Sequence, residues 1–354
     1  MTVLEPATLA DLVTAVRTTP RLIAVGAGTK PRLAAVAGDF VRLSTARLNG
    51  IVEYEPTEFT FTAQAGTPVR DIAATLAERG QYLPFDPLLA EAGATLGGTV
   101  AAGLSGPGRI RYGGLRDFII GVRFVDGEGR VLRGGGKVVK NAAGFDLPKF
   151  FTGSAGRFGV LAEVSFKVFP QPVTTRTLRL EVDGPAARAK VLMEAAATRW
   201  EPSALEAPAR ENFVYLRLAG PPPALDALTA EVLGRWPGTT LADRDAEVLW
   251  RDVRAFGWAH ATGTLVKIAL TPGQIPDFEA LFPNLPGARG WIGNGGNTGY
   301  LSLAPDATLP PLEWPALTLR GDAPLWPGAR PRFAVMRAVK AALDPPNRFP
   351  DLDD

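Results

Sequence analysis

The order of apolar and polar positions predicts helices and strands along the whole chain. Apolar residues recur every three or four positions over 8–19, which predicts an amphipathic helix with Thr8 as its N-cap. Residues 59–64 alternate strictly between apolar and polar, which predicts a half-buried strand. The same reasoning predicts strands over 21–25, 118–125, 130–132, 160–169, 177–182, 213–218 and 264–270, and helices from Val69 to Gly80 and over 146–151, 186–199, 224–235 and 331–343.

The composition changes after residue 172. Residues 173–330 are rich in proline and tryptophan and mix strand-like with helical stretches, which indicates a smaller α+β domain. Residues 331–343 return to a helical period. We therefore expect a first domain over 1–172, a second over 173–330, and a closing segment over 331–354 that returns to the first domain.

Charge and hydropathy exclude several classes of function. The chain has 354 residues and a net charge of +2, which gives no broad attraction for nucleic acid or an anionic membrane. The N-terminus lacks the pattern of a secretory signal, and the apolar window 88–106 is too rich in glycine for a membrane span. We expect a soluble cytoplasmic protein without direct membrane insertion, in which partners mediate any association with a membrane.

The chain has no cysteine and one histidine, His260. This excludes disulfides, a thiolate nucleophile and cysteine-ligated zinc or iron–sulfur centres within the chain. It also excludes any site that needs two imidazoles. We expect no metal site.

Three glycine-rich stretches stand out, at 26–30, 93–114 and 153–159. Closely spaced glycines let backbone amides approach a phosphate or pyrophosphate, but they also serve tight turns, and both interpretations remain open for each stretch. The second stretch holds eight glycines, from which we expect a loop rather than a helix or strand. The Rossmann fingerprint fails because Pro31 stands where a glycine is required, and no P-loop is present.

Taken together and in order, several short segments resemble flavoproteins of the p-cresol methylhydroxylase/vanillyl-alcohol oxidase type. Within that type, the chain resembles the smaller FAD-binding subunit of bacterial glycolate oxidases. The matching segments are 26–30 (GAGTK), 65–67 (AGT), 84–87 (PFDP), 94–101 (ATLGGTVA), 112–117 (YGGLRD), 140–147 (KNAAGFDL), 153–163 (GSAGRFGVLAE) and 343–349 (LDPPNRF).

The resemblance implies an α+β fold, with a two-part p-cresol methylhydroxylase-type FAD-binding domain and a smaller α+β cap domain. It implies an FAD-dependent oxidoreductase that oxidises a small 2-hydroxy acid within a complex. The partners would be a larger FAD-containing sister subunit and an iron–sulfur subunit. Two alternatives remain: a self-sufficient oxidase of a small alcohol, hydroxy acid or sugar, and a flavin-bearing structural subunit without turnover.

The resemblance also implies which residues hold FAD. Relatives often attach FAD through a histidine or cysteine in these loops, and neither residue type occurs in them here, so we expect non-covalent FAD. The implied cofactor residues are Gly26, Ala27, Gly28, Thr29, Lys30, Pro87, Thr95, Leu96, Gly97, Gly98, Thr99, Ala101, Gly103, Gly106, Gly156, Gly159, Val160 and Leu161.

The catalytic residues are unassigned at this stage. Related D-2-hydroxy-acid dehydrogenases use several histidines, including metal ligands, which this chain cannot reproduce. The candidates are His260, as the sole imidazole, and Arg116, as a cation inside a matching segment. Arg109 and Arg111 follow the glycine stretch and are further candidates for binding an anion, and residues 291–297 are expected to form a tight turn between strands.

Overall fold

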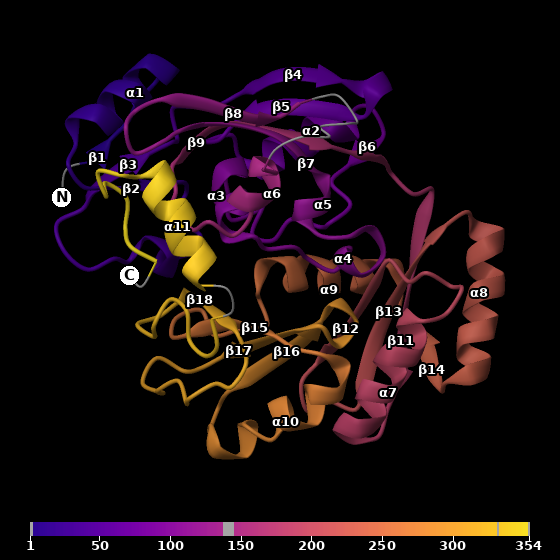
Figure 1. Ribbon diagram of the computed structural model, residues 1–354. Coiled ribbons are helices and arrows are strands. Elements are labelled where there is room, and N and C mark those ends of the chain that lie inside the picture. The colour runs from indigo at the N-terminus through magenta and orange to yellow at the C-terminus, as the bar shows by residue number, and fades with distance from the viewer. Residues whose placement is uncertain (1–2, 137–144, 331–332, 353–354) are drawn as a thin grey trace.

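A computed structural model describes residues 3–136, 145–330 and 333–352. Its strands form two main sheets, one early and one late in the chain (Figure 1). We call residues 3–136 and 145–170 the N-terminal part, residues 174–320 the cap part, and residues 333–352 the C-terminal segment. The stretch 140–144 of one matching segment and the expected helix start at 331 lie outside the described residues.

The N-terminal part begins with a small parallel sheet. Its order is β1-β3-β2, and α1 (Leu9–Thr18) begins at the expected N-cap, where the Thr8 hydroxyl accepts from the Asp11 amide. Leu12 and Val16 of α1 are fully buried, which confirms the amphipathic pattern. The strands are β1 (Val3–Leu4), β2 (Leu22–Val25) and β3 (Val41–Ser44).

A five-stranded antiparallel sheet completes the N-terminal part. Its order is β4-β5-β9-β7-β8, and Phe61 and Ala63 of β5 point into its core, as the alternation predicts. The strands are β4 (Ile51–Glu55), β5 (Thr60–Gln64), β7 (Ile119–Val125), β8 (Val131–Gly135) and β9 (Val160–Lys167), with β6 (Gln81–Tyr82) paired to β10 (Phe169–Pro170). The helices are α2 (Val69–Ala77), α3 (Leu96–Ala102), α4 (Arg109–Tyr112), α5 (Leu115–Phe118) and α6 (Leu147–Phe151).

The expectation that 93–114 is a loop is wrong, because α3 and α4 lie within it. Thr95 caps α3 by accepting from the Gly98 amide at 3.3 Å. Gly97 is needed for packing, since its amide donates to the Ala65 carbonyl at 2.7 Å and an added Cβ would lie 2.8 Å from the Ala65 Cβ. Close approach to β5 therefore explains a glycine inside a helix.

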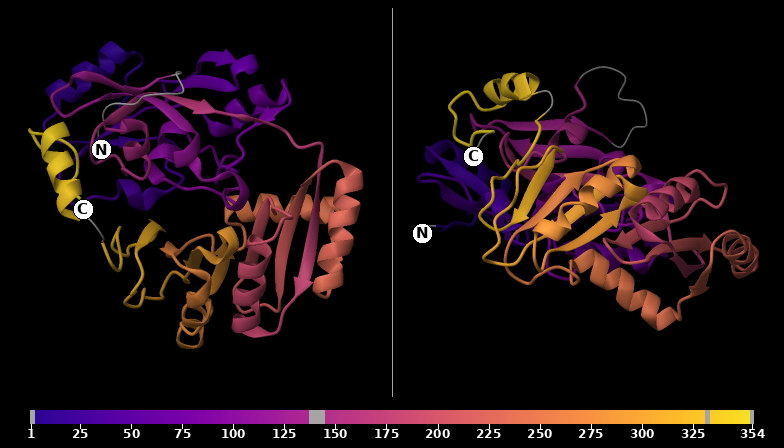
Figure 2. Two further views of the ribbon diagram at one scale, coloured as in Figure 1. Left: turned by 45° about the vertical axis from the view of Figure 1, so that its right-hand side comes forward. Right: turned by 90° about the horizontal axis from the view of Figure 1, so that it is seen from below.

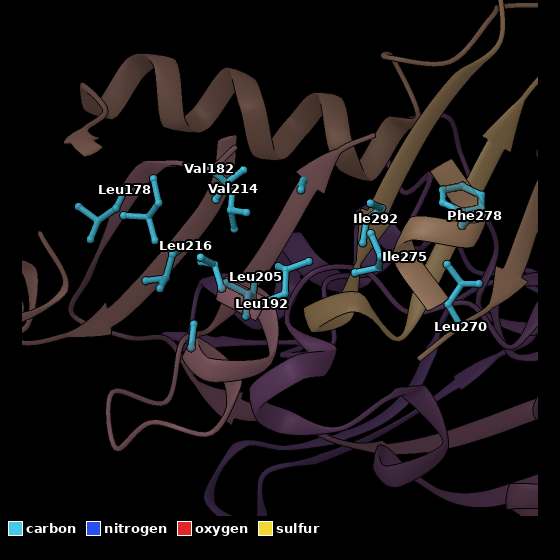
Figure 3. Packing of buried hydrophobic residues seen from close by; sticks show 14 of the residues in the cluster. Leu178, Val182, Leu192, Leu205, Val214, Leu216, Leu270, Ile275, Phe278 and Ile292 are labelled. Carbon is cyan, nitrogen blue, oxygen red and sulfur yellow. The ribbon is translucent and has the colours of Figure 1, made fainter. Parts of the chain in front are cut away.

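The cap part is one antiparallel sheet of eight strands in the order β14-β11-β13-β12-β16-β17-β15-β18. One face packs on α7, α8 and α10 around a core that includes Leu205, Leu216 and Ile292 (Figure 3). The strands are β11 (Thr174–Glu181), β12 (Ala204–Pro208), β13 (Phe213–Gly220), β14 (Gly238–Thr240), β15 (Leu265–Ala269), β16 (Arg289–Gly293), β17 (Thr298–Ser302) and β18 (Ala316–Arg320). The helices are α7 (Gly184–Ala196), α8 (Pro222–Arg235), α9 (Asp243–Ala255) and α10 (Ile275–Glu279).

The other face of the cap sheet looks toward the N-terminal part. Trp291 and Tyr300 of this face share a buried apolar cluster with Leu33, Leu104 and Ala155 of the N-terminal part. Helix α9 lies at the same junction (Figure 1). The two parts are therefore joined by a continuous core.

The C-terminal segment returns to the N-terminal part. Helix α11 (Phe333–Leu343) lies beside that part in both views of Figure 2. The Arg348 carbonyl accepts from the Leu22 amide of β2 at 2.9 Å, and the Arg348 guanidinium donates to the carbonyls of Gly127 and Thr19. The Asp344 carboxylate, 3% exposed, pairs with Lys340 at 2.5 Å and accepts from the amides of Arg348 and of Phe349. The last residues thus pair with the first sheet.

Candidate functional site: a glycine-lined cleft and the cap face

An open cleft with an empty volume of about 750 Å³ lies between the two sheets of the N-terminal part. We call it the glycine cleft. It is where β2, α3 and the loop before β9 meet. Its lining residues are Ala24, Val25, Gly26, Ala27, Gly28, Thr29, Lys30, Leu33, Ala34, Thr45, Ala65, Thr95, Gly97, Gly98, Ala101, Ser154, Ala155, Gly156, Gly159, Val160 and Leu161.

Backbone approach explains the glycines of this cleft. Gly28 has a φ of +70° and Gly156 a φ of +75°, a region that favours glycine. Gly26 lies against Thr95 so closely that an added Cβ would overlap the Thr95 hydroxyl. The loop after β2 and the start of α3 therefore face each other with little side-chain material between them.

Lys30 is the one cation among the lining residues of the cleft. Its side chain is 8% exposed, and its ammonium donates to the Thr29 hydroxyl at 3.0 Å. No carboxylate of the described residues pairs with it, and burial lowers its pKa to about 8. Because a buried cation without a counter-charge is unfavourable, this lysine and the exposed backbone of the glycines fit an anionic group such as a pyrophosphate.

The structure brings most of the expected cofactor residues together in the glycine cleft. The remaining ones lie elsewhere: Leu96 and Thr99 point into the interior, and the Thr99 hydroxyl finds no partner among the described residues. Gly103, with a φ of +62°, ends α3 against Gly153. Pro87 is half-buried outside the described cavities, and Gly106 lines a separate, smaller cavity.

The face of the cap sheet that looks toward the N-terminal part carries a row of polar side chains. Trp291 of β16 pairs with Tyr300 of β17, which pairs in turn with Lys267 of β15. Glu206 of β12 accepts from Trp291 Nε1 at 2.6 Å and from the Asn294 amide at 3.0 Å. Burial raises the pKa of Glu206 to about 7 and raises the pKa of Tyr300 as well. The turn expected over 291–297 covers 294–297, between β16 and β17, whereas 291–293 are the end of β16; the Asn294 amide of this turn is one of the two donors to Glu206.

Two cavities lie between this row and the N-terminal part. The smaller, about 320 Å³, is bounded by Ser105, Gly106 and Pro107 on one side and by Glu206 and Tyr300 on the other. The larger, about 910 Å³ and open to solvent, contains Lys267, and we call it the Lys267 cavity. Ser154 lines both this cavity and the glycine cleft, so the two spaces adjoin.

The sequence-based catalytic candidates lie apart from these spaces. His260 Nε2 is 2.9 Å from the Gly287 carbonyl oxygen, and His260 lines none of the described cavities. Arg116 is exposed on α5, and Arg111 pairs with Glu201 at 3.1 Å. Sequence reasoning did not identify Lys267 or Glu206. A lysine inside the apolar run 264–270 was the available signal for the first.

No described helix is both long enough and apolar enough to cross a lipid bilayer. No cluster of histidine, aspartate or glutamate side chains suited to a metal ion occurs within the described ranges.

Similarity to known proteins identifies the family of this chain. Residues 2–135 match the family described as FAD binding domain. The chain is 34% identical over 307 residues to glycolate oxidase subunit GlcE of Escherichia coli, which covers 84% of this chain and 82% of that one. It is 32% identical over 159 residues to glycolate oxidase subunit GlcD of Bacillus subtilis, which covers 45% of this chain and 34% of that protein.

Among solved structures, an alkyldihydroxyacetonephosphate synthase superposes with a TM-score of 0.70 over 98% of this chain and 74% of that one. At 16% identity this similarity concerns the fold alone. It agrees with the expected α+β fold, in which an FAD-binding domain of the p-cresol methylhydroxylase type carries a cap. On its identity to GlcE across most of both chains, this protein belongs to the glycolate oxidase subunit GlcE family and binds FAD.

Proposed function

We propose that this chain is the FAD-binding subunit of a complex that oxidises a small 2-hydroxy acid such as glycolate. The observation that carries the proposal is the glycine cleft, which adjoins a cavity under the cap and holds the buried Lys30, a cation that no carboxylate of the described residues neutralises. The cleft suits the pyrophosphate of FAD, and the adjoining cavity offers room beside it for a substrate.

The residues of the cleft would bind FAD and position it. Lys30 would neutralise pyrophosphate charge, and the glycines of 26–28 would let the backbone approach it closely. Gly156, Gly159, Val160 and Leu161, at and before the start of β9, would lie against the adenosine end of the cofactor or finish the adjoining loop. When bound, FAD supplies the two-electron acceptor for the oxidation.

We propose that FAD is held without a covalent bond. The chain has no cysteine, and His260 lies away from the glycine cleft. Acid precipitation is expected to release all the yellow colour into the supernatant. Colour that stays with the denatured pellet would contradict this part of the proposal.

Partners are part of the proposal. The relatives GlcE and GlcD are named as subunits of glycolate oxidase. We propose a larger FAD-containing sister subunit and an iron–sulfur subunit, because a cysteine-free chain must leave any cluster to another chain. Because the sole histidine lines none of the described cavities, the group that accepts the hydroxyl proton would not be an imidazole of this chain, and the sister subunit is our proposed source of it.

We also propose that the chain divides into an FAD-binding domain over 1–172, a cap domain over 173–330 and a closing segment over 331–354. The two sheets, 51–167 and 174–320, support this division. Expression of residues 173–330 alone tests it. A cooperative thermal transition is expected, and an unfolded product would count against the boundaries.

The cofactor site is tested by Lys30→Met, which keeps the length of the side chain and removes its charge. Loss of a charge-assisted contact of about 1.5–3 kcal/mol predicts FAD binding about 10 to 150 times weaker. Lys190→Met, at an exposed site on α7, is the matched control and should leave the affinity unchanged. Equal FAD affinity of the two variants would show that Lys30 does not contribute to FAD binding.

Turnover is tested by following anaerobic bleaching of the bound flavin with glycolate and with D-lactate, first on the chain alone and then with the sister subunit. Bleaching only with the partner supports a shared activity. Rapid bleaching of the flavin in the chain alone would contradict the proposal and indicate a self-sufficient oxidase. If the flavin is not bleached even with the partner present, the chain would be a structural subunit that carries flavin without turnover.

A further inference from the structure

Lys267 is half-buried in an open cavity beside the cofactor site. Its neighbours Val266 and Ile268 are fully buried in the cap core, so strand alternation turns Lys267 to the face that looks toward the N-terminal part. The Lys267 cavity, about 910 Å³, is open to solvent, which leaves the amine accessible to a small molecule. Because this cavity shares Ser154 with the glycine cleft, a molecule released beside the cofactor has a direct path to the amine.

The surroundings of Lys267 disfavour its charged form. Tyr300 of β17 and Leu317 of β18 are the residues paired with it on the two neighbouring strands, so an aromatic ring and an aliphatic side chain flank it on one face. Trp326 and Met336 add further apolar surface to the lining. Among the described residues, no carboxylate lines the cavity or pairs with Lys267. An ammonium in this place lacks both water and a counter-charge.

A second cation acts in the same direction. The positive charge of Arg109 on α4 adds to burial, and together they lower the pKa of Lys267 from 10.5 to about 8. The other cations of the lining interact with other groups: Arg157 donates to a backbone carbonyl at 2.7 Å, and Arg330 lies over the Phe333 ring at 5.6 Å. At about pH 7.5, roughly a quarter of Lys267 is then the neutral amine, compared with about one part in a thousand for an ordinary lysine.

A lysine that is desolvated and lies beside another cationic group is an activated nucleophile for carbonyl compounds. The neutral nitrogen attacks the carbonyl carbon with its lone pair, and a C–N bond forms. The carbonyl oxygen then leaves as water with the two hydrogens of the amine, and an imine remains. This condensation needs no oxidant or reductant.

We propose that Lys267 forms a reversible imine with a short 2-oxo acid that enters the Lys267 cavity from the cofactor site. This inference rests on the proposed function and deepens it, because the oxidation of glycolate yields such an acid, glyoxylate, as its product. The carbonyl group selects the neutral amine, and the positive charge of Arg109 favours a carbonyl compound that also carries a carboxylate. Lys267 thereby retains a reactive aldehyde close to the place where it is formed.

The test traps the imine by reduction. The FAD-loaded chain is incubated at about pH 7.5 with glyoxylate and cyanoborohydride, which converts an imine into a stable carboxymethyl-amine, and the modified lysines are mapped by peptide mass spectrometry. Lys190, whose side chain is 71% exposed, is the reference in the same sample. We expect Lys267 to be modified about tenfold faster, because its larger amine fraction outweighs the lower nucleophilicity of a less basic amine. Equal rates, or modification of Lys30 in place of Lys267, would overturn the proposal.

A second carbonyl compound tests the choice of ligand. Propionaldehyde is similar in size to glyoxylate but has no carboxylate. The rate at Lys267 divided by the rate at Lys190 removes the intrinsic difference in reactivity between the two compounds. This ratio should be at least fivefold lower with propionaldehyde, and equal ratios would refute the selection of a 2-oxo acid.

Variants locate the amine. Lys267→Arg keeps a positive charge but forms no imine, and Lys267→Met removes the charge as well. Both should lose the fast-forming adduct, whereas Lys190→Met should keep it. The FAD content and the thermal transition of each variant are measured first, and if Lys267→Met does not fold, Lys267→Arg and the wild-type map decide the question. Fast adduct formation that persists in Lys267→Arg would overturn the assignment.

These measurements separate the inference from the proposed function. A glyoxylate adduct on Lys267, without bleaching of the flavin by any hydroxy acid, would refute the oxidation and leave the reactive amine in place. Bleaching by glycolate without an adduct on Lys267 would refute this inference alone.

Discussion

One buried ion pair joins the cap part to the N-terminal part. Arg217 of β13 lies 2.6 Å from Asp86, in the PFDP segment, and the two side chains are 11% and 13% exposed. The guanidinium also donates to Ser203 and lies over the Trp250 ring at 4.9 Å. Removing either partner leaves the other charge buried without its counter-charge. We therefore expect removal of either partner to destabilise the junction strongly.

The magnitude follows from the burial. Breaking a buried pair by removing one partner costs about 3–5 kcal/mol, whereas an exposed pair contributes about 0.2–1 kcal/mol. We expect Asp86→Ala to lower the free energy of unfolding by about 3 kcal/mol. A double-mutant cycle with Arg217→Met, which keeps the packing of the stem on Trp250, should give a coupling of about 2 kcal/mol.

The control is an ion pair of the same length on the cap surface. Arg176 and Asp226 are also 2.6 Å apart, but their side chains are 28% and 68% exposed. The assay is urea unfolding of the FAD-loaded chain, followed by both tryptophan and flavin fluorescence. The cycle of Arg176→Met and Asp226→Ala should give less than about 1 kcal/mol. Equal coupling energies for the two pairs would refute the argument from burial.

Three further predictions concern stability. Gly66→Ala should lower the free energy of unfolding by about 2 kcal/mol or more, because the added Cβ would overlap the Thr45 carbonyl. Gly234→Ala on α8, where the space around the glycine is open, should raise it by about 0.5–1 kcal/mol; chemical unfolding measures both. Burial raises the pKa of Glu206 from 4.5 to about 7, so the contribution of Glu206 to the free energy of unfolding is fully present below pH 4.5 and is lost as the pH rises to 7. The free energy of unfolding of Glu206→Gln should therefore rise by up to about 3 kcal/mol relative to wild type between pH 4.5 and pH 8. A difference in melting temperature that does not depend on pH would contradict this. Thr95→Ala should lower the unfolding free energy by about 1 kcal/mol through loss of the α3 N-cap, and an unchanged value would show that the cap contributes nothing.

Local chemistry made much of the fold predictable. Thr8 caps α1, and Asp146 caps α6 by accepting from the Lys149 amide, because short polar side chains satisfy the first amides of a helix. The turn 126–129 joins β7 to β8, with a φ of +75° at Gly129. Each of these features depends on residues close together in sequence.

Features set by distant residues were not predictable in the same way. The α3 helix was missed because one of its glycines, Gly97, is explained by contact with Ala65, more than thirty residues earlier. Lys267 and Glu206 share one sheet face only because β16 and β17 lie between their strands, and that strand order cannot be derived from spacing. The glycines of the cleft were predictable from the family resemblance, whereas the charged groups of the cap face were not.

The return of the C-terminal segment affects how the chain is made. The Leu22 amide of β2 donates to the Arg348 carbonyl, so the edge of the sheet beside the glycine cleft pairs with a residue that is synthesised more than three hundred positions later. At about 5–20 residues per second, synthesis of the intervening cap part takes roughly 8–30 s. For that interval the nascent N-terminal part has an unpaired strand edge, which exposes it to chaperones and to aggregation.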